Sequence, residues 1–359
     1  MSDYIKIATV IGARPQFIKA AVVSRELKKY KDIQEIIIHT GQHYDWNMSS
    51  VFFEEMNIPK PNYFFDINGL NHGAMTGQML EKIEFVLLKE KPSLVLVYGD
   101  TNTTLAGALA AKKHHIKIAH IEAGLRSFNI KMPEEVNRII TDRISDYLFC
   151  PTEKAIENLR REGFNSIGAK ISNVGDVMYD AVLYYSEFSA KYSSIISRLN
   201  LNDFILCTIH RAENVDFKNR LKSIIEALNH ISKEKKIVLP LHPRTKNFIK
   251  QSNIKLNFEP IDPVGYFDML ELLKHCQLVI TDSGGLQKEA YFFDKFCITL
   301  RDETEWVELV ENGFNQLAGA DPDKIIMLYE GALNQKNHFA ASLYGDGQSA
   351  KKIVKEVML

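Results

Sequence analysis

The 359-residue sequence lacks the features that would place it in a membrane or outside the cell. No apolar run approaches the ~20 residues that cross a bilayer. The N-terminal stretch MSDYIKIATVIG enters a strand pattern without the layout of a signal peptide. The four cysteines, Cys150, Cys207, Cys276 and Cys297, form no CxxC pair and lie mostly in apolar runs. We therefore expect a cytoplasmic protein without a membrane partner, whose cysteines are buried free thiols.

The sequence also lacks the signatures of several kinds of binding site. Its histidines are scattered and form no His/Cys cluster, so no metal site is expected. The first strand-to-helix turn reads GARPQ rather than GxGxxG, which disfavours a dinucleotide, and we expect no cofactor. The net charge of −1 gives no electrostatic reason to expect nucleic acid as a partner.

The sequence does contain a regular alternation of apolar strand patterns and amphipathic helix patterns. Its 45% apolar and 25% charged residues are typical of a globular protein, and its length suggests about two domains. Strands are expected at 4–12, 35–40, 94–99, 117–122 and 148–151, and in a second series at 204–210, 236–242, 278–281 and 297–301. Helices are expected at 15–30, 74–90, 102–114, 133–145, 152–162, 217–233, 265–275, 285–293 and 322–334.

Continuous apolar strands separated by helices indicate parallel sheets that are covered on both faces. We therefore predict an α/β protein with two doubly wound, Rossmann-like domains that face each other across a cleft. The predicted domains are residues 1–175 and 176–346, and residues 347–359 form a C-terminal helix that returns to the first domain. Ligands of such sheets bind at the carboxyl ends of the strands, so polar residues at those ends are the candidates for function.

One such strand end, in TDSGGLQKEA, is followed by the turn Ser283-Gly284-Gly285 and then by a helix pattern. Glycine lets the backbone approach a ligand closely, and the first N–H groups of a helix lack partners within the helix. Together with the helix dipole, these groups favour an anion, best matched to a phosphate. An ordinary glycine-rich connection fits the same stretch.

Three acidic residues fall near the predicted cleft. Asp100, in VYGDTNTT, lies between a strand and a helix, where it also suits an N-cap. Glu122, in HIEAGLRS, ends a strand before an alanine and a glycine and is a poor N-cap. Glu134, in MPEEVNR, lies in a first helical turn, where a carboxylate also suits the helix dipole. Because the acids converge on one site, we interpret all three as candidates for proton transfer.

Basic residues are expected around the same cleft. His210 ends a strand beside Arg211 in CTIHRAEN, and His242 ends another in LHPRT. Arg14 and Lys19 add cations from the first domain. A histidine–arginine pair that faces a phosphate site favours anion binding or proton donation to a leaving oxygen. A diphosphate on one wall and carboxylates on the other suit the departure of a nucleoside diphosphate from a sugar.

These motifs resemble the non-hydrolysing UDP-N-acetylglucosamine 2-epimerase family. The resemblance covers essentially the whole chain in order, through IGARPQFIK, YGDTNTT, HIEAGLRS, PEEVNR, NVGDVMYDA, HRAEN, TDSGGLQKEA and RDETEWVE. It implies the two-domain glycosyltransferase-B architecture. Within the family the sequence looks closest to the UDP-2,3-diacetamido-2,3-dideoxyglucuronate 2-epimerases, which invert C2 for polysaccharides such as O-antigen or capsule. It further implies a UDP-sugar as substrate and a homodimer.

The resemblance also implies a mechanism and residue roles. UDP leaves together with the C2 proton to give a 2-acetamidoglycal, and then adds back with a proton on the other face of C2. By match, Asp100, Glu122 and Glu134 would transfer protons, and His210 would stabilise or protonate the departing phosphate oxygen. Ser283, Gly284 and Gly285 would hold the diphosphate and Glu289 the ribose. The full set of implied binding residues is Arg14, Lys19, Arg138, His242, Ser283, Gly284, Gly285 and Glu289.

Some positions depart from the simpler N-acetylglucosamine enzymes, which usually read GTRPE and RDTTERPE where this sequence reads GARPQ and RDETEWVE. Gln16 thus replaces Glu and Trp306 replaces Arg, while Met269 stands where an aromatic residue usually contacts the nucleotide. One hypothesis is that Gln16 avoids repulsion of a sugar 6-carboxylate and that Lys131 supplies a counter-charge. Neutral drift at a helix start is the alternative.

Four other functions stay open at this point. They are the parent UDP-N-acetylglucosamine 2-epimerase activity, a hydrolysing epimerase, a glycosyltransferase on the same fold, and a non-catalytic sensor of nucleotide sugars. The sensor is disfavoured because binding alone would not require Asp100, Glu122 and Glu134 together.

Overall fold

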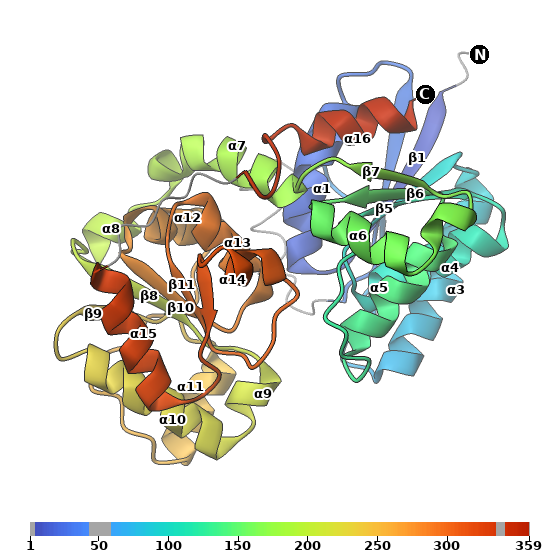
Figure 1. The fold of residues 1–359 in the computed structure, drawn as a ribbon. Helices are drawn as coiled ribbons and strands as arrows, with labels where there is room; N and C mark the ends of the chain where they lie inside the picture. The colour runs from blue at the N-terminus through green and yellow to red at the C-terminus, as the bar shows by residue number, and fades with distance from the viewer. Residues whose placement is uncertain (1–3, 43–58, 335–341, 359) are drawn as a thin grey trace. The chain divides into compact units, whose positions relative to one another are not determined.

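The computed structural model describes residues 4–42, 59–334 and 342–358. It divides into two compact units, of which unit 1 comprises Met1–Leu183 with Ser342–Leu359 and unit 2 comprises Tyr184–Ala341. The division falls inside helix α7 (Val177–Tyr192), after the position near residue 175 that the sequence suggested. Each unit is built on a parallel sheet, which confirms the predicted fold class (Figure 1).

Unit 1 holds a seven-stranded sheet in the order β3-β2-β1-β4-β5-β6-β7. Its strands are β1 (Ile5–Ile11), β2 (Ile33–His39), β3 (Tyr63–Phe64), β4 (Leu94–Tyr98), β5 (Lys117–Ile121), β6 (Tyr147–Cys150) and β7 (Lys170–Asn173). Its helices are α1 (Arg14–Leu27), α3 (His72–Glu90), α4 (Asn102–Lys113), α5 (Pro133–Ile144), α6 (Glu153–Arg161), the 3-10 helix η1 (Phe164–Ser166) and α16 (Ser349–Val357). The strand β4 is buried along its whole length, as expected of a strand covered on both faces.

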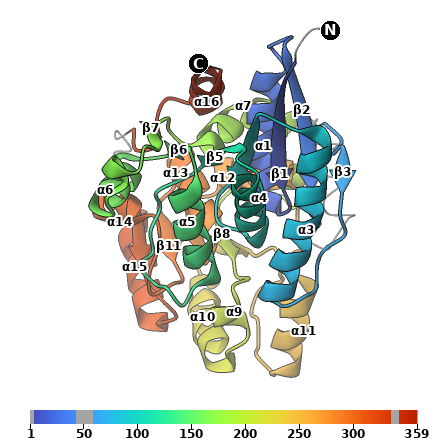
Figure 2. The same cartoon turned by 90° about the vertical axis from the view of Figure 1, so that its right-hand side faces the viewer.

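The helices of unit 1 cover both faces of this sheet. Helices α3, α4 and α5 pack side by side, as Figure 2 shows. The chain moves from β1 to β2 in one direction and from β3 to β4 in the other, so right-handed crossovers put α1 on the opposite face. Helix α16 packs against α1, which confirms that the C-terminal helix returns to the first domain.

Unit 2 holds a five-stranded sheet in the order β12-β11-β10-β8-β9. Its strands are β8 (Phe204–Thr208), β9 (Lys236–Val238), β10 (Leu278–Thr281), β11 (Cys297–Thr299) and β12 (Asn315–Leu317). Its helices are α8 (Ile195–Arg198), α9 (Ala212–Val215), α10 (Lys218–Ile231), α11 (Pro243–Gln251), α12 (Tyr266–His275), α13 (Gly284–Phe292), α14 (Val307–Glu311) and α15 (Pro322–Asn334).

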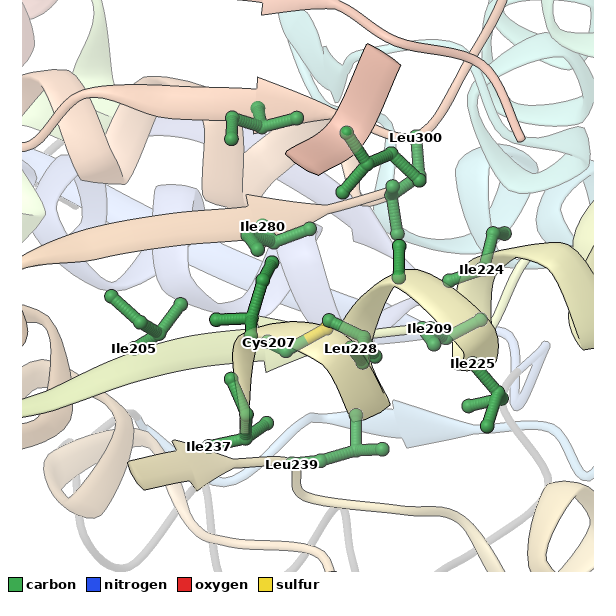
Figure 3. Packing of buried hydrophobic residues seen from close by; sticks show 14 of the residues in the cluster. Ile205, Cys207, Ile209, Ile224, Ile225, Leu228, Ile237, Leu239, Ile280 and Leu300 are labelled. Atoms are coloured by element: carbon green, nitrogen blue, oxygen red, sulfur yellow. The ribbon is translucent and has the colours of Figure 1, made fainter. Parts of the chain in front are cut away.

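The core of unit 2 is formed by apolar side chains of the sheet and of the helices that cover it. In Figure 3, Ile205 and Cys207 of β8 lie with Ile280 of β10 and Leu228 of α10 in one cluster. The cysteines are all buried and free, as predicted. Burial raises the pKa of Cys276 and of Cys297 to about 12, so these thiols stay protonated and unreactive at neutral pH.

Some elements differ from the sequence prediction. Strand β9 ends at Val238 instead of reaching residue 242, and Pro240, which has no N–H to donate, makes only an isolated bridge to Ile261. Helix α7 and the short strands β3, β7 and β12 were not predicted. Among the helices that the structure describes, none has both the length and the apolar character that a membrane crossing needs.

Candidate active site

Several sequence candidates lie at the point in each sheet where the strand order reverses. In unit 1 this point lies between β1 and β4, and in unit 2 it lies between β8 and β10. At such a reversal the loops after two neighbouring strands diverge and leave room for a ligand. Arg14 follows β1 and Asp100 follows β4, while His210 and Ser283 follow β8 and β10.

Asp100 does not cap the helix that follows it. The cap of α4 is Thr101, whose hydroxyl oxygen accepts a hydrogen bond from the Thr104 N–H at 3.3 Å. The Asp100 carboxylate instead forms an ion pair with Arg138, whose side chain is 4% exposed, whereas that of Asp100 is 32% exposed. Because the cap is supplied by its neighbour, the structure removes capping as the reason for an acid at position 100.

Arg138 is held by a second carboxylate, that of Glu135, which the sequence analysis missed. Glu135 is buried and accepts hydrogen bonds at 3.0 Å from the backbone N–H groups of Ser127 and Phe128. It therefore fixes both the guanidinium group and the loop before α5. The spacing of three residues between Glu135 and Arg138 on one helix was the available signal. Glu134, the residue that was predicted, is half-buried in the first turn of α5.

Glu122 forms a buried ion pair with Lys19, with side chains 7% and 9% exposed. Its φ angle is +73°, a left-handed conformation that is uncommon for a residue other than glycine and is often found at functional sites. Gly99 also has positive φ (+64°), and a Cβ there would lie 3.2 Å from Oε2 of Glu122. The loop that carries Asp100 therefore directly meets the loop that carries Glu122.

Gln16 is buried, 2% exposed, and its amide is fully used inside unit 1. Its Oε1 accepts from the N–H groups of Gly12 and Ala13 at 2.8 and 3.0 Å. Its Nε2 donates to the Tyr98 carbonyl oxygen at 2.8 Å. These hydrogen bonds give Gln16 a structural role, because the side chain joins the turn after β1 to the end of β4. A glutamate would set an oxygen against the Tyr98 carbonyl, so Gln16→Glu cannot isolate an effect on the substrate.

Arg14 and Lys131 are the two other candidate cations of unit 1. Arg14 is the first residue of α1 and is half-buried. Lys131 is exposed in the loop before α5, where its backbone N–H donates to Asn129 Oδ1 at 3.2 Å.

In unit 2 the predicted anion site is the N-terminus of α13. Ser283 caps the helix, and its hydroxyl oxygen accepts from the Leu286 N–H at 3.4 Å. Gly284 is the first helical residue, and a Cβ there would lie 2.5 Å from Oε1 of Glu305. Gly285 faces open space, so steric contact does not explain its lack of a side chain. The turn after β10 thus ends in a capped helix start.

His210 is oriented by Asp282, a fully buried carboxylate. The Asp282 side chain accepts from the His210 and Arg211 backbone N–H groups at 3.1 and 3.0 Å, and from Asn214 Nδ2 at 3.1 Å. The His210 ring, 54% exposed, presents Nδ1 to Asp282 Oδ1 at 3.1 Å. Burial would raise the pKa of Asp282, but His210 and the other donors hold that pKa below its usual range. Nε2 of His210 is the ring nitrogen left to act on a ligand.

The remaining candidates of unit 2 lie in different settings. His242 is exposed immediately before α11, and Glu289 on α13 is 6% exposed. Met269 on α12 is partly buried against an apolar cluster. Trp306 is buried, and Nζ of Lys288 lies 3.9 Å from its ring centroid. This cation–π contact gives the departure from the family's arginine a role in packing.

The candidates therefore form one cluster in each unit. Unit 1 brings together Lys19, Asp100, Glu122 and Arg138, and adds Glu135. Unit 2 brings His210 to Asp282 and places Ser283, Gly284 and Gly285 at the start of α13. Within the described parts of the chain, no group of three or more His, Cys, Asp or Glu residues is arranged to hold a metal ion.

Comparison with known proteins places these clusters in context. A family model described as UDP-N-acetylglucosamine 2-epimerase matches residues 25–358. The chain is 56% identical over 352 residues to a UDP-2,3-diacetamido-2,3-dideoxy-D-glucuronate 2-epimerase of Pseudomonas aeruginosa, covering 98% of this chain and 99% of the relative. It is 47% identical over 363 residues to a UDP-N-acetylglucosamine 2-epimerase of Methanocaldococcus jannaschii, covering 98% of each chain.

Solved structures agree with the sequence relatives. The crystal structure of the Methanocaldococcus jannaschii UDP-GlcNAc 2-epimerase in complex with UDP-GlcNAc and UDP is similar with a TM-score of 0.91 and 46% identity. That comparison covers 98% of this chain and 99% of the other. A UDP-GlcNAc 2-epimerase from Neisseria meningitidis bound to UDP-GlcNAc is similar with a TM-score of 0.88 and 31% identity, over 98% and 99% of the two chains.

Proposed function

Since this chain belongs to the UDP-N-acetylglucosamine 2-epimerase family, we propose that it inverts C2 of UDP-2,3-diacetamido-2,3-dideoxyglucuronate to give the manno epimer. The observation that carries the proposal is the 56% identity to an enzyme of that name over 98% of this chain. The 47% identity to a UDP-N-acetylglucosamine 2-epimerase supports the same chemistry on a simpler sugar as the second candidate.

The proposed reaction is an elimination followed by an addition. The C1–O bond breaks, UDP leaves with its electron pair, a carboxylate takes the C2 proton, and a 2-acetamidoglycal with a C1–C2 double bond forms. UDP then adds back to C1 while a proton reaches the other face of C2. Two faces require acid–base groups on two sides, which suits Asp100, Glu122 and Glu134.

In this proposal unit 2 holds the nucleotide. The Ser283–Gly285 turn supplies backbone N–H groups and the positive end of α13 for the diphosphate, and Glu289 binds the ribose. His210, oriented by Asp282, stabilises or protonates the leaving phosphate oxygen. Arg14, Lys19, Arg138 and His242 complete the binding set.

The direct test is NMR of UDP-2,3-diacetamido-2,3-dideoxyglucuronate incubated with the protein in heavy water. We expect the manno epimer to appear and solvent deuterium to enter C2 of substrate and product, with no net loss of UDP-sugar. The same experiment with UDP-N-acetylglucosamine separates the two candidates. Stoichiometric release of free UDP would indicate a hydrolysing epimerase instead. Absence of deuterium from both sugars would contradict any epimerase assignment and leave a glycosyltransferase or a sensor.

The proposed product suits a precursor of a bacterial surface polysaccharide, such as O-antigen or capsule. We propose that the protein works in the cytoplasm. The family name of the relative supports the sugar class.

We also propose that the protein is a homodimer joined through α3. This helix exposes Phe85 and Leu88, 66% and 53% exposed, on the side that also exposes the small residues Ala74 and Gly77, about two to four turns away. An isologous contact would lay the aromatic end of one α3 against the small-residue end of the other.

The double variant Phe85→Glu with Leu88→Glu is expected to halve the molar mass measured by light scattering, because each new charge would be buried in the contact. Met327→Glu, which changes a 59% exposed apolar residue of α15 in unit 2, is the matched control and should leave the mass unchanged. A double variant with the wild-type mass would contradict the assignment of α3.

A further inference from the structure

A chain of alternating charges lies beneath the two loops that carry Asp100 and Glu122. Glu162 binds Arg126 through both carboxylate oxygens, at 2.7 Å to Nε and 2.8 Å to Nη2. Arg126 Nη1 donates to Asp142 Oδ2 at 2.6 Å. Asp142 Oδ1 lies 2.7 Å from His120 Nδ1. His120 and Asp142 are 0% exposed and Arg126 is 2% exposed, so this part of the chain of charges is internal, whereas the Glu162 side chain at its end is 34% exposed.

The second ring nitrogen of His120 also faces an acceptor. Its Nε2 lies 2.7 Å from the carbonyl oxygen of Gly99. A carbonyl oxygen and an ionised carboxylate can only accept a hydrogen bond, so each ring nitrogen of His120 faces an acceptor. Burial would raise the pKa of Asp142, but its bonds to His120 and Arg126 hold it below the usual range, which keeps the carboxylate ionised.

This His120–Asp142 pair is tied to both acid-bearing loops. Through Gly99, His120 holds the peptide that leads directly into Asp100. Through its Oδ2, Asp142 accepts from the backbone N–H of Gly124 at 3.2 Å, two residues after Glu122. Both loops contain a left-handed residue, Gly99 and Glu122, and for Glu122, which is not a glycine, this conformation needs support from its surroundings.

We propose that His120 is a positioning residue of the epimerisation: its Nε2–H bond to the Gly99 carbonyl, anchored by Asp142, sets the turn that aims the Asp100 carboxylate. The inference deepens the proposed function and rests on it. His120 lies next to the last residue of strand β5, within KIAHI, and the sequence analysis did not identify it as a candidate.

The energetics favour a role beyond packing. Replacing a buried ion network by apolar residues of similar size is often neutral or stabilising, so stability alone does not explain four buried or half-buried charges. The network instead links two loops through hydrogen bonds of defined direction. A displacement of about 1 Å in a reacting group lowers a rate by about 10²-fold. The network would therefore affect the reaction rate by holding the Asp100 carboxylate in position.

Two variants separate the two contacts of His120. In His120→Asn the amide nitrogen takes the place of Nδ1 and still donates to Asp142, but nothing reaches the Gly99 carbonyl. In His120→Gln the amide nitrogen takes the place of Nε2 and still donates to Gly99, but the bond to Asp142 is lost. Both variants remove the imidazole ring and leave a polar amide side chain, so they form a matched pair.

The measurement is steady-state epimerisation of UDP-2,3-diacetamido-2,3-dideoxyglucuronate, with protium or deuterium at C2, together with the midpoint of thermal unfolding. We expect His120→Asn to lower kcat by about 10²-fold and to keep KM within about 2-fold of wild type. The primary isotope effect should be larger than in the wild type, because proton transfer becomes slower relative to other steps. His120→Gln should retain kcat within about 3-fold of wild type, because the bond that sets the turn is kept.

The outcomes distinguish the inference from the function on which it rests. A wild-type kcat in His120→Asn would overturn the inference. Equal losses of kcat in both variants would also overturn it, if they parallel a lower midpoint of thermal unfolding and leave the isotope effect unchanged. A wild-type protein that neither converts the sugar nor exchanges its C2 hydrogen would overturn the proposed function itself, whatever the variants do.

Discussion

Asp100→Asn is expected to lower kcat for epimerisation by about 10³-fold while UDP binds with wild-type affinity. Asparagine keeps the shape of the side chain but neither takes nor gives a proton at neutral pH. Arg138 keeps its ion pair with Glu135, so the variant does not leave a buried guanidinium group unpaired. Thr101 still caps α4. The change therefore removes proton transfer with little change to the structure around it.

Deuterium incorporation at C2, followed by NMR, measures this effect, and titration calorimetry with UDP measures binding. Asp203→Asn is the matched control, since Asp203 also pairs with a cation, Lys235, but on the exposed surface of unit 2. The control should keep wild-type kcat because an exposed pair contributes little. Wild-type exchange of the C2 hydrogen for deuterium in Asp100→Asn would show that the Asp100 carboxylate does not transfer the C2 proton.

Lys19→Met is expected to destabilise the protein by about 3–5 kcal/mol, because it leaves the Glu122 carboxylate buried without its cation. Both side chains of this pair are less than one tenth exposed, so water cannot replace the lost partner. Glu122 also holds a left-handed backbone conformation that the pair helps to fix. The effect should therefore exceed that of any exposed ion pair of the protein.

Scanning calorimetry of Lys19→Met, Glu122→Gln and the double variant tests this expectation. The double variant should recover most of the lost stability, because no unpaired charge remains, yet it should stay inactive if Glu122 transfers a proton. Losses in the two single variants that simply add in the double variant would show that the ion pair is not the source of the effect.

Much of the fold was predictable because its signals are local. Continuous apolar runs such as Leu94–Tyr98 can only be satisfied as strands covered on both faces, and their alternation with helices leads to parallel sheets. The short strands β3, β7 and β12 have two to four residues and carry too few side chains for a periodic pattern. Strand β9 was overextended because Pro240 sits in an apolar run that otherwise reads as strand.

The candidate site was predictable as a set of strand ends but not as a set of contacts. Asp100 had two interpretations, and the structure excludes the N-cap because the hydroxyl of Thr101 caps α4. For Gln16 the sequence suggested an effect on the sugar carboxylate but not the hydrogen bonds that its amide makes with Gly12 and Tyr98 in the interior. His120 reads as one more core residue of β5 until Gly99 and Asp142 are seen on either side of its ring.

By itself the sequence determined the fold class and the strand ends that carry polar residues, because hydrophobic period and turn chemistry act over a few neighbouring residues. Only the tertiary structure decided which charge meets which. Lys19 and Glu122 are 103 positions apart and Asp100 and Arg138 are 38 apart, and no local pattern encodes such pairs. They form because β1, β4 and β5 align as neighbours in one parallel sheet, which brings the loops at their carboxyl ends together.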